Sequence, residues 1–223
     1  FRSMNEMGWH VHSFDHEDSN GQYEFDFAYA DVLTMCDRFV LWRLLTKEIA
    51  RRYGWEATFM PKPYVDRTGS GSHFNMSLSS SKTGKNISGD KRDTRGCGLS
   101  KISYQFLGGI KRHAKAIVAT TCPTVNSYKR FQHGSWAPTS LAWSQDNRTA
   151  GFRVVGSGQS LRIECRIPGA DVNPYLAFAA ALASGLDGVK NEMQPPAEFI
   201  GNAYDQADIA HVAATFGEAI TEF

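Results

Sequence analysis

Residues 161–167 read Leu-Arg-Ile-Glu-Cys-Arg-Ile, so apolar and charged side chains alternate along the segment. Side chains of a β-strand point alternately to the two faces of a sheet, and this segment therefore predicts a strand with one buried face. The other face carries Arg162, Glu164 and Arg166. An arginine binds carboxylates and phosphates bidentately, while a carboxylate can hold a hard cation. The strand predicts a sheet face that binds anions beside a cation.

Two further segments show the same alternation. Their polar faces carry His73, Asn75 and Ser77 in residues 72–78, and Glu24 in residues 23–27, with Glu17 seven residues earlier across a bend. Carboxylates and neutral imidazole are ligands that Mg²⁺ or Mn²⁺ accepts. Together the three strands suggest metal-assisted phosphate chemistry. For any one strand, a polar face is more often a solvated sheet surface, and only the shared acidic and arginine character of three strands balances the two interpretations.

Periodicity and capping residues predict the helices and short strands of the rest of the chain. Helical spacing of apolar residues, with caps such as Asp31 and Asn173-Pro174, predicts helices over 31–53, 100–120 and 173–187. Short strands are expected at 57–60, 141–144 and 151–155, and a polar loop at 79–98. Because strands and helices do not alternate regularly, the pattern favours an α+β fold with an antiparallel sheet.

The composition excludes several classes of protein. The chain has 223 residues, of which 42% are hydrophobic, so one large domain can bury a core. Basic and acidic residues number 24 and 23, which gives no pull toward nucleic acid or an anionic membrane. No apolar stretch reaches the length of a membrane span. Four scattered cysteines without a Cys-x-x-Cys pair favour a reducing, cytoplasmic setting.

The two ends of the chain suggest a fragment. Phe1 stands in what reads as the approach to a strand, and Phe223 falls inside a helical pattern. Residues 1–223 are therefore expected to be one domain of a longer protein.

Two other motifs admit a different chemistry. His10, His12 and His16, with the neighbouring acids, could form a His-x-His zinc site of a hydrolase, although no second histidine cluster follows. The segment Thr68-Gly-Ser-Gly71 could bind a phosphate through backbone N–H groups. It lacks a P-loop lysine and is also an ordinary turn sequence.

Six separated motifs strongly resemble the glutamine synthetase family, in that family's order and spacing. They are Ala57-Thr-Phe-Met-Pro-Lys-Pro63, Gly69-Ser-Gly-Ser-His73 with Ser77-Leu78, Asn126-Ser-Tyr-Lys-Arg130, Asp146-Asn-Arg-Thr149, Arg162-Ile-Glu-Cys-Arg166 and Asn173-Pro-Tyr-Leu176. The resemblance implies a catalytic domain built as a curved antiparallel sheet, or half-barrel, flanked by helices. It also implies that the family's small N-terminal domain is absent from these residues, and that the complete protein is a homo-oligomeric ring.

The resemblance assigns roles residue by residue. It implies Glu17 and Glu24 as ligands of the metal near glutamate, and His73 and Glu164 as ligands of the metal on the nucleotide phosphates. Each metal in the family takes one more glutamate from upstream of these residues, so the isolated chain is expected to be inactive. The substrate glutamate is expected to contact Gly69, Arg130 and Arg166. ATP is expected to contact Phe27, Tyr29, Asn75, Ser77, Arg153 and Arg162, and Arg148 and Trp136 are expected to serve catalysis.

The implied reaction joins glutamate to a nitrogen nucleophile. ATP, with Mg²⁺ or Mn²⁺, phosphorylates the side-chain carboxylate of L-glutamate, and ammonia or a primary amine then displaces phosphate to give a γ-glutamyl amide. Because both first reactants are anionic, metal ions and arginines must stabilise the charge in transit. The competing hypothesis is a catalytically silent family member with a structural or binding role, and a metal-dependent hydrolase is more remote.

Three positions depart from the family's pattern. Asn75 stands where a histidine is common, and Gln159 where a lysine is frequent. Trp136 occupies the place where ammonia-using members carry a glutamate that closes the site and helps take a proton from ammonium. An aromatic residue there is expected in relatives that use larger amines. The alternative is that Trp136 only packs its loop.

Overall fold

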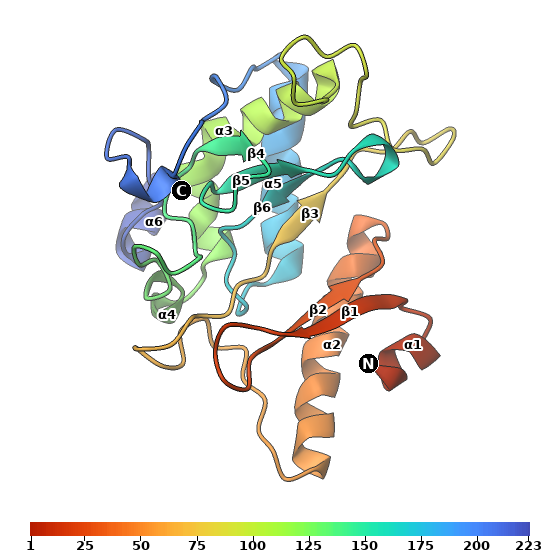
Figure 1. Ribbon diagram of the computed structural model, residues 1–223, viewed down its shortest axis with the longest axis vertical. Helices are drawn as coiled ribbons and strands as arrows, with labels where there is room; N and C mark the ends of the chain where they lie inside the picture. Colours follow the sequence, from red (N-terminus) through yellow and green to blue (C-terminus); the bar gives the residue numbers. More distant parts are fainter.

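The computed structural model describes all residues from 1 to 223, in two layers of helices and strands (Figure 1). In chain order the elements are α1 (Arg2–Glu6), β1 (Val11–His16), β2 (Tyr23–Phe27), α2 (Val32–Arg52), β3 (Phe74–Met76), α3 (Lys101–Thr121), α4 (Val125–Tyr128), β4 (Trp143–Gln145), β5 (Phe152–Val155), η1 (Gly158–Ser160), β6 (Arg162–Cys165), α5 (Pro174–Lys190), η2 (Ala203–Asp205) and α6 (Phe216–Glu222). The predicted α+β class is confirmed, and all three long helices form where they were expected.

The main sheet has four strands in the order β3-β6-β5-β4. The β3–β6 and β5–β6 pairs are antiparallel, as expected, but β4 and β5 are parallel, with Trp143 opposite Phe152. The expectation of a wholly antiparallel sheet was wrong at this edge. The loop 146–151 returns the chain to the start of β4 before β5 begins, so both strands run in the same direction.

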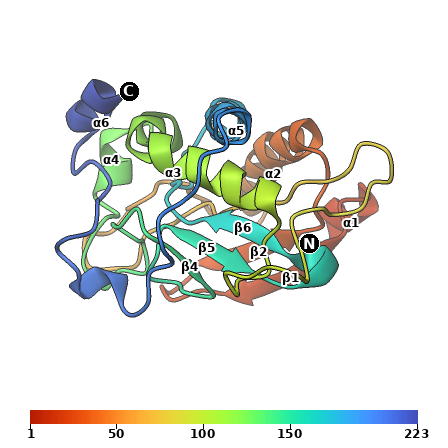
Figure 2. The same cartoon turned by 90° about the horizontal axis from the view of Figure 1, so that it is seen from above.

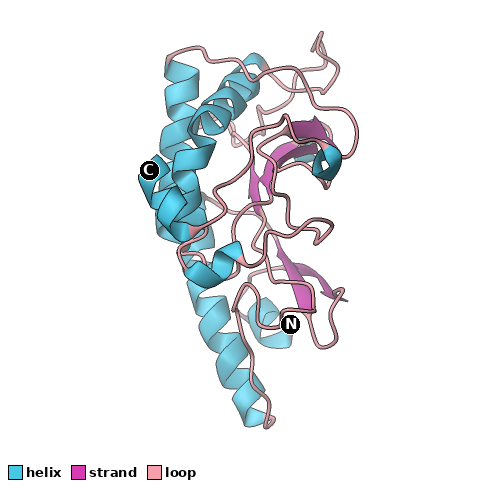
Figure 3. Cartoon of the chain, turned by 90° about the vertical axis from the view of Figure 1, so that its left-hand side faces the viewer, coloured by secondary structure: helices cyan, strands magenta, loops and turns pink.

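The helices α2, α3 and α5 form one layer over the strands (Figures 2 and 3). Leu107, Ile110 and Val118 of α3 are fully buried and belong to the same apolar cluster as Phe152 and Val154 of β5. The side chains on the opposite face of the sheet are therefore the ones left free to bind ligands. No helix of the chain combines the length and apolar composition that a membrane crossing requires.

Glycines allow α3 and α5 to approach closely. A β-carbon on Gly109 would lie 2.6 Å from the backbone nitrogen of Gly188, and one on Gly185 would collide with the ring of Phe106. Gly108 likewise packs closely, because a β-carbon there would lie 2.7 Å from the Met193 carbonyl oxygen. The start of α5 is fixed as predicted, because the Asn173 side chain accepts hydrogen bonds from the N–H groups of Tyr175 and Leu176.

Two local expectations differ from the structure. Residues 57–60 form no strand, because Pro61 follows and its carbonyl group accepts from Ser70 N at 2.7 Å instead of from a neighbouring strand. The start of the chain forms the short helix α1 rather than the approach to a strand. Met4 of α1 packs with Trp9 and Val11 in a separate small cluster beside the two-stranded β1–β2 sheet.

Candidate active site

Glu164 lies at the centre of the polar face of the main sheet. The strand register places Glu164 of β6 directly between Asn75 of β3 and Arg153 of β5. Its Oε2 accepts hydrogen bonds from Arg166 Nη1 at 3.0 Å and from Arg153 Nη1 at 3.3 Å, while its Oε1 lies 3.5 Å from His73 Nδ1. The sheet therefore brings together five of the predicted site residues.

Charge and burial fix the ionisation of this group. Burial opposes the charged form of Glu164, but His73, Arg166 and Arg153 outweigh it and lower the pKa of the carboxyl. For His73, desolvation and the positive charges of Arg166 and Arg130 lower the pKa to about 3, against the attraction of Glu164. A carboxylate thus faces a neutral imidazole, and those are the forms in which both side chains bind metals.

Glu17 and Glu24 meet where β1 and β2 are joined. A hydrogen bond shared with Glu17, partial desolvation, and the negative charges of Asp26, Glu17 and Glu164 raise the pKa of Glu24 to about 8. Glu17, Glu24 and Asp26 take part in no salt bridge, whereas Glu164 is paired with Arg153 and Arg166. A divalent cation would relieve their repulsion, so the donor set fits the predicted metal.

No three His, Cys, Asp or Glu side chains of residues 1–223 are grouped closely enough to hold a metal ion by themselves. The chain offers ligand pairs: Glu17 with Glu24, and His73 with Glu164. His10, His12 and His16 likewise form no such group.

Arg130 is buried behind this face, with 2% of its surface exposed. Its Nη1 donates to the Ile167 carbonyl at 3.0 Å and its Nη2 to the Arg166 carbonyl at 3.1 Å. A β-carbon on Gly71 would lie 3.4 Å from both Arg130 Nη2 and His73 Nε2. The guanidinium group therefore reaches the His73 side of the sheet, where it forms no direct salt bridge with a carboxylate; Asp171 attracts it only from a distance.

The remaining arginines surround the sheet edge. Arg162 donates from Nε to Asn75 Oδ1 at 2.8 Å. Asn75, which stands where the family commonly has a histidine, therefore positions the Arg162 side chain. Arg153 also bonds Asp146, the first residue of the loop that carries Arg148. Arg148 itself is exposed, as is Ser77 beyond the end of β3.

Phe27 and Tyr29 are not brought to the main sheet. The ring of Phe27 packs edge-on against Trp9 and Trp42, with centroids 6.1 and 5.7 Å apart. Tyr29 is 86% exposed in the turn before α2.

Trp136 projects from the loop 131–138, with 58% of its surface exposed. Its φ of 59° is in the left-handed region, which is unfavourable for a bulky residue. Ser135 fastens the loop by donating to the Arg130 carbonyl at 3.0 Å. The exposed side chain argues against a role confined to packing the loop.

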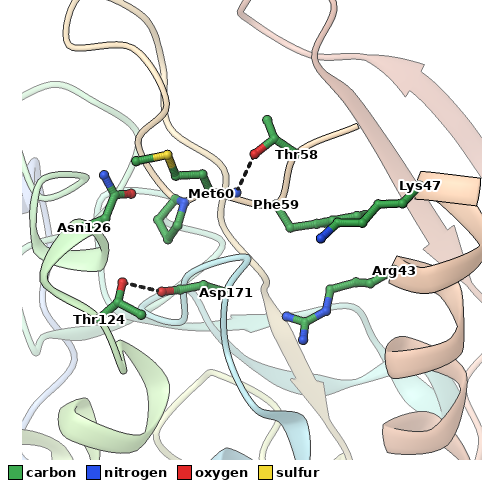
Figure 4. Close-up of a pocket in the computed structure, with 9 residues that line it drawn as sticks. Arg43, Lys47, Thr58, Phe59, Met60, Thr124, Asn126 and Asp171 are labelled. Atoms are coloured by element: carbon green, nitrogen blue, oxygen red, sulfur yellow. Dashed lines mark hydrogen bonds between the residues drawn. The ribbon is translucent and has the colours of Figure 1, made fainter. Parts of the chain in front are cut away.

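A cavity of about 380 Å³ lies between α2, the segment 58–61 and the start of α4, and no sequence pattern predicted it. Arg43 and Lys47 project toward it from α2, opposite Asp171 (Figure 4). Asp171 Oδ2 accepts from Thr124 and Ser127 hydroxyls, both at 2.7 Å, and these residues hold α4 just before Arg130. Asp171 lies beside the Asn173-Pro174 cap, and its partners are more than 40 residues away in sequence, so no local pattern indicated this contact.

The fold and this sheet face together define the class of the molecule: an α+β domain on which a carboxylate and an imidazole lie among arginines, beside a second pair of carboxyl groups. The family model for the glutamine synthetase catalytic domain matches residues 1–223, and the chain belongs to that family. The predicted resemblance is thereby confirmed.

Individual relatives divide between two kinds of nitrogen substrate in their names. The chain is 47% identical to a glutamine synthetase of Clostridium saccharobutylicum, over 91% of this chain and 45% of the relative. It is 41% identical to a glutamate–methylamine ligase of Methyloversatilis universalis, over 91% of this chain and 46% of the relative. It is 42% identical to a gamma-glutamylethanolamide synthetase of Streptomyces coelicolor, over 98% of this chain and 46% of the relative.

The solved structure of apo GmaS without ligand superposes with a TM-score of 0.90 at 36% identity, covering 99% of this chain and 51% of that one. The chain spans about half the length of the curated relatives it matches.

Proposed function

We propose that the complete protein is an ATP-dependent ligase that forms a γ-glutamyl amide from L-glutamate and a primary amine. The observation that carries the proposal is the arrangement around Glu164, where a carboxylate and a neutral imidazole face one another between arginines. Such a group can hold a cation and phosphate oxygens at the same place. The names of the relatives support the reaction class.

The proposed roles follow the positions of the side chains. Glu17 and Glu24 would hold one divalent cation, and His73 with Glu164 a second; bound Mg²⁺ or Mn²⁺ supplies positive charge to the transferring phosphoryl group. Arg130 and Arg166, with the backbone at Gly69, bind the glutamate. Asn75, Ser77, Arg153 and Arg162, with Phe27 and Tyr29 further away, bind ATP. Arg148, on an exposed loop, stabilises the charge that develops during transfer.

Trp136 is proposed to favour an alkylammonium over ammonium. Its indole offers apolar contact and a cation–π attraction of roughly 0.5–2 kcal/mol. Its exposed side chain and left-handed backbone support this role, because a strained and solvent-facing aromatic residue contributes little to packing. We further propose that the enzyme acts as a homo-oligomer in the cytoplasm; its four cysteines are free and buried.

The test compares nitrogen substrates in the complete protein. ADP formation is measured at fixed ATP and glutamate with ammonia, methylamine, ethanolamine and putrescine, in the wild type, in Trp136→Glu and in Trp55→Glu, a control at an indole that is 73% exposed after α2. We expect the wild type and the control to prefer an amine, and Trp136→Glu to shift toward ammonia. A wild type that prefers ammonia, with Trp136→Glu unchanged, contradicts the amine proposal. ADP release that needs no glutamate contradicts the ligase.

A further inference from the structure

The loop 131–138 reads Phe-Gln-His-Gly-Ser-Trp-Ala-Pro and contains one side chain of a type that commonly serves as a general base, the imidazole of His133. An amine reaches an enzyme at neutral pH as an ammonium ion, and it must lose a proton before its nitrogen can attack an acyl carbon. Trp136 in the same loop cannot accept that proton. The inference below rests on the proposed ligase function, and it concerns where the proton goes.

His133 is held by a carboxylate from a distant segment. Its Nε2 lies 3.4 Å from Asp205 Oδ1, across 72 residues of sequence, and its ring packs against Tyr204 with centroids 5.6 Å apart. The partner segment η2 is itself fixed, since the Asn202 side chain caps it and Ala203 N donates to Thr149 Oγ1 at 2.9 Å. The His133 side chain is nevertheless 72% exposed, which leaves the other ring nitrogen free.

The pair borders the site already described. Ser135, two residues after His133, is bonded to the carbonyl of Arg130. The Tyr204 hydroxyl is buried and has no hydrogen-bond partner. Burial raises the pKa of Tyr204, and the positive charges of Arg166 and Arg130 oppose that rise. Because both arginines act on it, the Tyr204 hydroxyl lies near the two arginines that are proposed to bind glutamate. His133 therefore stands at the margin of the space in which the acyl group would be held.

We propose that His133 accepts the proton of the nitrogen substrate and that Asp205 positions its imidazole. In this arrangement Nε2–H donates to Asp205 Oδ1, and the lone pair of Nδ1 accepts one proton from the ammonium. The freed nitrogen lone pair forms the C–N bond with the γ-carbonyl carbon. The C–O bond to the phosphate breaks with its electron pair leaving on the phosphate oxygen, and the second surplus proton of the nitrogen leaves with the phosphate.

The experiment compares a nucleophile that must lose a proton before it attacks with one that is already unprotonated. Methylamine is almost fully protonated at neutral pH, whereas hydroxylamine is mostly the free base and forms a γ-glutamyl hydroxamate that is measured by its colour with ferric ion. Initial rates with both nucleophiles are compared in the complete wild type, His133→Gln and Asp205→Asn. His113→Gln is the matched control, because it removes a histidine paired with Asp187 at 2.8 Å between α3 and α5.

We expect His133→Gln to lower kcat/KM for methylamine about 100-fold and to leave hydroxamate formation within about threefold. Asp205→Asn should reduce the methylamine reaction about 10-fold, and His113→Gln should affect neither nucleophile. An equal loss with both nucleophiles assigns His133 a structural role and overturns the inference, as does an unchanged rate with methylamine. If the wild type forms no hydroxamate, the ligase function itself fails, and this inference fails with it.

Discussion

Gly69 lies against Arg130: a β-carbon at residue 69 would come within 2.7 Å of Arg130 Cγ, and it would also collide with the Pro61 carbonyl oxygen. The glycine therefore sets how deeply the arginine side chain is buried. Its backbone is itself positioned from the β1–β2 turn, because Gln22 Nε2 donates to the Gly69 carbonyl at 3.1 Å.

Gly69→Ala should displace Arg130, lower the free energy of unfolding by about 1–3 kcal/mol and raise the KM for glutamate in the complete protein. Chemical denaturation and a glutamate titration measure the two effects. Gly217→Ala is the control, since a β-carbon there meets no atom closer than 4.0 Å. A Gly69→Ala protein with wild-type stability and KM would show that the Gly69 contact does not position Arg130.

Asp171→Ala should loosen α4 and the following arginine, because two hydroxyl groups lose their acceptor. We expect a loss of about 1–3 kcal/mol in the free energy of unfolding and a higher KM for glutamate with little change in kcat. Asp171→Asn, which keeps an acceptor oxygen, should recover most of both quantities. Equal behaviour of the two variants would argue that the negative charge, and not the hydrogen bonds, is what matters.

Magnesium should stabilise the protein through Glu17 and Glu24, because a cation relieves the repulsion of carboxylates that lie side by side. Thermal unfolding in EDTA and in millimolar Mg²⁺ measures the gain in Tm. Glu24→Gln should raise the Tm in EDTA and reduce the gain from Mg²⁺. Glu222→Gln, at a surface carboxylate 3.7 Å from Lys115, should show the wild-type gain. The prediction fails if Glu24→Gln responds to Mg²⁺ as the wild type does.

Lys111 gives stability a specific dependence on pH. Burial lowers the pKa of its ammonium group from 10.5 to about 8, although its Nζ donates to the Leu141 carbonyl. Between pH 8 and 10.5 the unfolded chain binds a proton that the folded chain has lost, so this group makes folding more favourable as the pH rises. Lys111→Met should remove that contribution. Urea unfolding at pH 7.5 and 10 measures the free energy of unfolding of both proteins. The value for the wild type minus the value for Lys111→Met should be larger at pH 10 than at pH 7.5.

The local parts of the fold could be predicted from sequence because their signals are local. The alternation in residues 161–167 located β6, and the Asn173-Pro174 pair located the start of α5. The parallel pairing of β4 with β5 could not be predicted in this way, because it depends on the path of the loop 146–151 and not on side-chain alternation.

The candidate site shows the same division. Alternation placed His73 and Glu164 on polar faces, but only the pairing of β3 with β6 brings their side chains to within 3.5 Å of each other. Phe27 was assigned to ATP by resemblance, whereas its ring packs with Trp9 and Trp42 in a cluster that no period of the sequence reveals. The contact between His133 and Asp205 joins two loops, and loops carry no periodic signal by which a partner could be found.

The glycine contacts between α3 and α5 have a consequence for motion. Two helices whose backbones touch cannot slide or rotate past one another without atomic overlap, so α3 and α5 move as a unit. Rearrangement between substrate entry and product release then falls to segments outside these two helices, such as the loops 79–98, 131–138 and 146–151 and the turn between β1 and β2. Amide hydrogen exchange should accordingly be slowest along the facing sides of the two helices and should change on ligand binding in those segments.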